Sequence, residues 1–79
     1  DALTAYYGNE QTVRYYEKEG LPNATEITKT AMRLKESGEI DFMNYLRTLN
    51  DAFEIQLNYI EALRNYNSSV IEIDYLNGN

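Results

Sequence analysis

The second half of the chain carries an unbroken helical pattern of apolar residues. Between residues 41 and 76 there is no Gly or Pro, and apolar residues recur every three or four positions, which predicts one amphipathic helix over about 41–76. At ~1.5 Å per residue this helix would be ~50 Å long, whereas a compact domain of this length has a radius of gyration near ~12 Å. The pattern therefore predicts a rod. The residues of this main stripe are Phe42, Leu46, Leu49, Phe53, Leu57, Ile60, Leu63, Tyr66, Val70 and Ile73.

The first half is punctuated by glycines and one proline, and it predicts two shorter helices. A helix over about 23–37 begins with Asn23 as a candidate N-cap and is followed by Gly38, which can adopt the left-handed conformation. A weaker pattern predicts a helix over about 2–19, which Gly20 ends. The apolar face of the stronger helix consists of Ala24, Ile27, Ala31 and Leu34.

The simplest architecture for these elements is all-α: one long antiparallel helical hairpin spanning residues 1–79 as a single unit. The first two helices form one arm, with the link 20–22 as either a sharp turn or a break between roughly collinear helices. The long helix forms the other arm, and residues 37–40 form the tip. Ile55, Tyr59 and Ala62 lie off the main stripe, so we expect the apolar surface of the hairpin to be covered by further helices.

Composition narrows the chemistry. The 79 residues include 13 acidic and 7 basic side chains, a net charge of −6, and no Cys or His. Disulfides, Cys/His zinc sites and the usual nucleophile–base pairs are therefore excluded, and we expect a non-catalytic chain without a cofactor. The acidic balance argues against a nucleic-acid surface. No signal-peptide pattern or apolar run near 18 residues is present, and we expect the chain to be a segment of a longer polypeptide.

Two sets of side chains could bind cations, although each has a simpler explanation. Met32 and Met43 flank Gly38 at similar distances and could approach each other as soft-metal ligands, but core packing is the simpler explanation. Acidic residues of the second arm could bind a hard cation, but a solvated helix face explains them too, and we assign no metal site. These acidic residues are Asp41, Asp51, Glu54, Glu61, Glu72 and Asp74.

The tip is the first candidate for a functional site, because exposed turns often carry binding residues. A plain helix–turn–helix corner is the alternative. The candidate partner-binding residues of the tip are Ser37, Gly38, Glu39 and Ile40.

The eight Tyr residues suit half-buried helix seams, where the ring packs and the hydroxyl reaches water.

Four stretches, over residues 31–40, 41–52, 59–67 and 73–78, together resemble the C-terminal periplasmic repeat of TolC-type outer-membrane efflux proteins, closest to the CusC/CzcC-like group that serves heavy-metal pumps. The stretch 31–40 is similar to the helix that ends at the hairpin tip of that family, and 41–52 is similar to its returning helix. The stretches 59–67 and 73–78 resemble the end of the repeat. The break Glu19-Gly20-Leu21-Pro22-Asn23 departs from the continuous helix of the best-known members and resembles segments fused to pumps of the resistance–nodulation–division type.

The resemblance implies a non-catalytic role in a tripartite efflux system for heavy-metal cations. Three protomers of such proteins form a helical tunnel across the periplasm, and the hairpin tip meets a periplasmic adaptor protein or the inner-membrane pump. This segment would not insert into a membrane, and alone it would dimerise or form a bundle. The alternative is a small α-helical interaction module, either a TPR-like repeat or a dimerising hairpin. A break between residues 53 and 62 would favour the TPR-like form.

Overall fold

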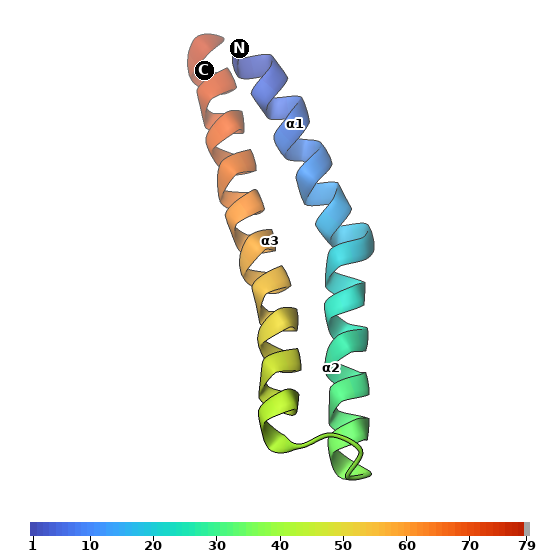
Figure 1. The fold of residues 1–79 in the computed structure, drawn as a ribbon. Helices are drawn as coiled ribbons and strands as arrows, with labels where there is room; N and C mark the ends of the chain where they lie inside the picture. Colours follow the sequence, from blue (N-terminus) through green and yellow to red (C-terminus); the bar gives the residue numbers. More distant parts are fainter. Residues whose placement is uncertain (79) are drawn as a thin grey trace.

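The computed structural model describes residues 1–78, and 90% of the chain is helical. Helices α1 (Ala2–Tyr15) and α2 (Leu21–Glu36) form the first arm, and α3 (Phe42–Leu76) forms the second. The two arms lie side by side, with both chain termini at one end and the connection 37–41 at the other (Figure 1). The molecule measures 59 × 19 × 17 Å. The predicted all-helical class and the predicted rod shape are therefore confirmed.

The first arm has no break at residues 20–22, so the predicted junction is wrong. A single π-helical turn, Tyr16–Gly20, joins α1 to α2, and the Leu21 N–H donates to the carbonyl of Tyr16, five residues earlier. Gly20 is right-handed (φ −63°, ψ −53°), so it does not end a helix in the left-handed form. Asn23 lies inside α2 and is not its N-cap. A wide turn keeps the backbone helical where a Gly-Leu-Pro sequence ordinarily stops it.

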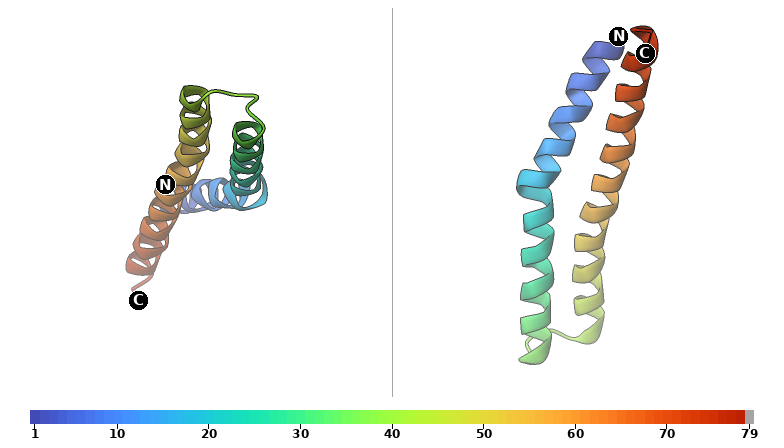
Figure 2. Two further views of the ribbon diagram at one scale, coloured as in Figure 1. Left: turned by 90° about the horizontal axis from the view of Figure 1, so that it is seen from below. Right: turned by 180° about the vertical axis from the view of Figure 1, so that it is seen from behind.

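The π-turn also bends the first arm. Figures 1 and 2 show that α1 and α2 run in different directions on either side of it, as is usual where a helix contains a π-bulge. The half-buried Tyr16, buried Gly20 and buried Ala24 all face α3 at steps of four residues. Two ordinary α-helical turns hold about 7.2 residues. The wide π-turn accommodates the eighth residue of the interval from Tyr16 to Ala24. The bend therefore keeps both halves of the first arm in contact with α3.

The tip is a glycine-terminated helix end followed by a capped helix start. Gly38 has φ +78°, as predicted, and the Glu39 N–H donates to the Leu34 carbonyl at 2.9 Å while the Gly38 N–H donates to the Lys35 carbonyl at 3.1 Å. This pair of hydrogen bonds is the Schellman arrangement. Asp41 then caps α3, because its Oδ1 accepts the Asn44 N–H at 2.8 Å. The predicted helix over 41–76 is thus found within one residue.

Candidate functional site: the α3 stripe and the tip

The seam between the arms is built from small side chains. The most buried apolar side chains of α3 are Ala52 (3% exposed) and Ala62 (6%), together with the polar Ser69. Small residues let two helix backbones approach closely. Half-buried Tyr rings lie between them along the seam, which confirms the expected position of most tyrosines. The buried residues contributed by the first arm are Val13, Gly20, Ala24 and Ala31.

The large apolar residues of α3 mostly lie outside this seam, which corrects the expected packing. Ile55 and Tyr59, assigned off the main stripe, are half-buried against the first arm, whereas Phe53 is 58% exposed and Ile60 is 51% exposed. We define the α3 stripe as the continuous outward row, whose members are exposed except for the half-buried Leu49 and Leu63. Its residues are Phe42, Leu46, Leu49, Phe53, Leu57, Ile60 and Leu63.

Charge is segregated from the α3 stripe. At about 100° per residue, the stripe lies within about 80° of Phe53 around the helix axis. The charged residues of this segment lie about 80–160° from Phe53 around the helix axis, on the flank of the stripe that faces away from the seam. Helix α3 between Phe42 and Leu63 therefore has three faces: a small-residue seam, an uncharged apolar stripe and a charged face. The charged residues are Arg47, Asp51, Glu54 and Glu61.

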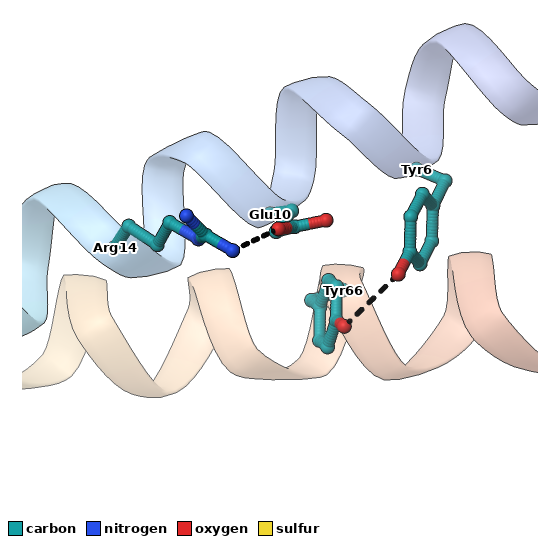
Figure 3. A network of polar contacts seen from close by, with 4 residues as sticks. All are labelled: Tyr6, Glu10, Arg14 and Tyr66. Atoms are coloured by element: carbon teal, nitrogen blue, oxygen red, sulfur yellow. Dashed lines mark hydrogen bonds and ion pairs between the residues drawn. The ribbon is translucent and has the colours of Figure 1, made fainter.

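Side-chain hydrogen bonds connect α1 to the C-terminal part of α3. The hydroxyl oxygens of Tyr6 and Tyr66 are 3.4 Å apart, and Figure 3 shows them pointing toward each other. Within α1 itself, Arg14 pairs with Glu10 one turn away, at 2.6 Å, and Figure 3 draws this pair beside the tyrosines. The Asn9 side-chain amide donates to the Ser69 hydroxyl and, at 3.2 Å, to the Asn65 carbonyl. These bonds fix the register of the arms at the open end.

The tyrosine contacts raise two pKa values. The hydrogen bond with Tyr66 is the main cause that raises the pKa of Tyr6 to about 12, followed by the nearby Tyr66 and Glu10 charges and partial burial. The Tyr59 hydroxyl donates to Glu17 Oε2 at 2.9 Å, and this bond is the main cause that raises the pKa of Tyr59. Both phenols therefore stay protonated near neutral pH, as hydrogen-bonded structural groups.

At the tip, three of the candidate binding residues are exposed. Ser37, Gly38 and Glu39 face solvent, and Ile40 is half-buried. The Lys35 ammonium lies 4.6 Å from the ring centroid of Tyr45 and 5.8 Å from that of Phe42. These cation–π contacts tie the end of α2 to the start of α3. The tip therefore presents a hydrogen-bonded turn to solvent.

The candidate cation ligands all lie on the surface. Met32 and Met43 are both exposed, at 47% and 65%, so neither is a core residue as the simpler explanation required. Within residues 1–78 there is no cluster of three or more acidic side chains that could hold a metal ion. Asp41 caps α3, and Glu61 pairs with Arg64 at 3.7 Å. The other acidic candidates, Asp51, Glu54, Glu72 and Asp74, are exposed.

A hollow of the described surface lies beside the π-turn. It has a volume of about 530 Å³, is open to solvent, and has Gly20 and Ile55 among its lining residues. The sequence does not predict this hollow, because Gly20 before Leu21-Pro22 is typical of a helix end. Of the helices within residues 1–78, none is long and apolar enough to cross a membrane.

Comparison of the chain with family models, with curated proteins and with solved structures finds no match. No relative therefore assigns a role to any of these residues.

Proposed function

We propose that this chain is a non-catalytic helical hairpin that forms part of the wall of a periplasmic tunnel in a tripartite efflux system for heavy-metal cations. The observation that carries this proposal is the uncharged α3 stripe running along a slender rod. A tunnel wall of this kind is made of helices packed side by side, and each helix needs an apolar face for its neighbour in addition to the face within its own hairpin.

The assignment to efflux rests on the resemblance of residues 31–52 and 59–78 to TolC-type proteins, and the geometry is compatible with it. A seam of alanines buries little surface, so the hairpin needs neighbours for most of its stabilisation. The tip, with its exposed Ser37, Gly38 and Glu39, is the surface that we assign to a periplasmic adaptor protein, beside an inner-membrane pump of the resistance–nodulation–division type.

The interaction-module alternative is favoured in only one of its two forms. A TPR-like repeat needs a helix break every 12–16 residues, and α3 runs without a break from Phe42 to Leu76. A self-associating hairpin uses the same α3 stripe as the tunnel wall does. The two functions therefore differ in the partner and not in the surface.

The proposal can be tested in bacteria that carry the parent protein. Gly38→Val places a β-branched residue at φ +78°, so the tip must change its backbone. We expect reduced capture of the adaptor in a pull-down and a lower copper or silver concentration that stops growth. Gly8→Ala is the matched control, because a Cβ at Gly8 meets no atom within 4 Å.

A second variant tests the wall. Phe53→Glu puts a charge on the α3 stripe without disturbing the seam, because Phe53 is 58% exposed. We expect loss of metal tolerance at normal protein abundance, with Glu54→Gln, on the charged face, as the control. Unchanged tolerance in both Gly38→Val and Phe53→Glu cells would reject the efflux role.

A further inference from the structure

The hairpin exposes more surface area than a compact chain of the same mass does. The chain, of 9.2 kDa, exposes 5933 Å², whereas a compact monomer of that mass exposes about 4,900 Å². The excess, about 1,000 Å², is close to the roughly 800 Å² per partner that a standard stable interface buries. One further contact along the rod is therefore sufficient to bring its exposed area to an ordinary level.

The charge distribution allows a second copy of the chain to make that contact. Each copy carries a net charge of −6, which would oppose self-association through most of the surface. The α3 stripe is the exception, because its seven residues are uncharged and the charged face of α3 lies to one side of it. Such an uncharged surface does not select a partner that carries positive charge. The identical uncharged stripe of a second copy can pack against it.

The middle of the stripe is symmetric about Phe53. Leu49 and Leu57 lie four residues from Phe53, and Leu46 and Ile60 lie seven residues from it, whereas the position eleven residues after Phe53, which matches Phe42, is Arg64. Two copies of such a pattern match when they run antiparallel across a two-fold axis, because each residue i then meets its counterpart on the other copy. The axis falls at Phe53.

The ends of the rod favour the same orientation. Residues 1–9 and 65–78, at the open end, contain no Lys or Arg, and they contain Asp1, Glu72 and Asp74. Glu10 is paired with Arg14. Parallel pairing of two rods would bring these acidic ends together. Antiparallel pairing places them at opposite ends of the dimer, far beyond the ~8 Å over which exposed charges act at physiological salt.

We infer that two copies of this chain associate through the α3 stripe as an antiparallel, two-fold symmetric dimer in which Phe53 of one copy meets Phe53 of the other. The four arms then form a bundle in which α3 is covered on both its seam and its stripe. This inference rests on the proposed role of the stripe as a packing surface, and it names a second copy of the separate chain as the partner. An antiparallel pair has its tips at opposite ends, whereas a tunnel wall has them at one end, so the stripe serves one of these partners at a time.

Single cysteines test the orientation cleanly, because the natural chain has none. In the antiparallel dimer the Phe53→Cys chain oxidises to a covalent dimer of twice the 9.2 kDa chain mass, since the two Cβ atoms meet at the axis. The Leu46→Cys chain alone does not cross-link, whereas its mixture with the Ile60→Cys chain does. Efficient self-cross-linking of Leu46→Cys would overturn the antiparallel arrangement in favour of a parallel one.

Association itself is measured on the unmodified 79-residue chain by sedimentation velocity over a concentration series. We expect a monomer–dimer equilibrium that Phe53→Glu weakens at least about 100-fold, because it buries an unpaired charge. Tyr75→Glu is the control, since Tyr75 is 80% exposed and lies outside the stripe. Circular dichroism checks that each variant stays helical.

A monomer at all concentrations, or a dimer that Phe53→Glu leaves intact, would overturn the inference. Either result leaves the efflux role to be judged separately, because metal tolerance in cells reports packing against any helix of the parent assembly. If Phe53→Glu cells lose metal tolerance while the purified natural chain is strictly monomeric, the tunnel-wall proposal is retained and the dimer is rejected.

Discussion

At the scale of single residues, two glycines of the first arm occupy opposite environments. Gly8 lies on the exposed side of α1, and a Cβ there meets no atom within 4 Å. Gly20 is buried in the π-turn, and a Cβ there would lie 2.7 Å from Tyr16 Cδ1 and 3.5 Å from Ile55 Cγ2. The same change from Gly to Ala should therefore act in opposite directions at the two sites.

We expect Gly8→Ala to raise the free energy of unfolding by about 0.5–1 kcal/mol, because Ala fits a helix better than Gly. We expect Gly20→Ala to lower it by about 1–2 kcal/mol, because the displaced Tyr16 ring costs more than the helix propensity returns. Urea unfolding followed by circular dichroism measures both. Equal stabilisation by the two variants would show that Tyr16 is not packed on Gly20.

The Tyr6–Tyr66 contact predicts a stability change at alkaline pH. The phenol of Tyr6 has a pKa of about 12 in the folded chain against 10.0 ordinarily. Between these values the unfolded chain loses the proton and the folded chain keeps it, so unfolding releases a proton and stability falls as pH rises. Below pH 10 this contribution is fully present.

We expect Tyr6→Phe to reduce the loss of stability between pH 10 and 12, measured as the slope of the urea midpoint against pH. Tyr75→Phe should leave that slope unchanged, because Tyr75 is 80% exposed. If the wild-type and Tyr6→Phe slopes coincide, the two hydroxyls do not interact in solution.

At the scale of elements, the ends of α3 follow from local signals. Asp41 provides the N-cap hydrogen bond, and Gly38 provides the left-handed residue before it. The glycine turn is predicted because it acts within about four residues of sequence, whereas Asp41 is considered in the sequence only as a candidate cation ligand. The junction in the first arm could not be predicted, since Gly20 and Pro22 ordinarily end a helix, and a π-turn depends on packing against α3.

We expect Asp41→Ala to lower the free energy of unfolding by about 1 kcal/mol, through loss of the 2.8 Å bond from the Asn44 N–H. Asp41→Asn retains an acceptor oxygen and should lie within a few tenths of a kcal/mol of the natural chain. Thermal unfolding followed at 222 nm measures both variants. A loss of the same size in Asp41→Asn would assign the effect to charge instead of capping.

At the scale of the whole molecule, the pairing of the faces is the part that the sequence leaves open. Helix α3 has one row of large apolar residues and another of mixed small and aromatic residues, and hydrophobic periodicity favours the larger row as the seam. The structure buries the smaller one, because Ala24 and Ala31 on the first arm match small residues such as Ala52. The matching residues are more than twenty positions apart in the sequence. The apolar pattern of a single helix therefore does not predict which of its faces forms the seam.

The rod shape gives a prediction in solution. The Cα radius of gyration is 17.5 Å, against about 12 Å for a compact chain of this length. We expect X-ray scattering, extrapolated to zero concentration, to give a value near that of the rod. Values near 12 Å at the lowest concentrations would instead mean that the arms fold back into a globule.

The π-turn at Tyr16–Gly20 has a consequence for how such a chain can change during evolution. An added residue in an ordinary helix rotates everything beyond it by about 100° and misplaces every later contact. Here one wide turn takes up the additional residue, and Ala24 and Ala31 still meet α3. The arm thus has one position where its length can vary by a residue without loss of its partner. Insertions and deletions in related sequences should therefore gather at this turn.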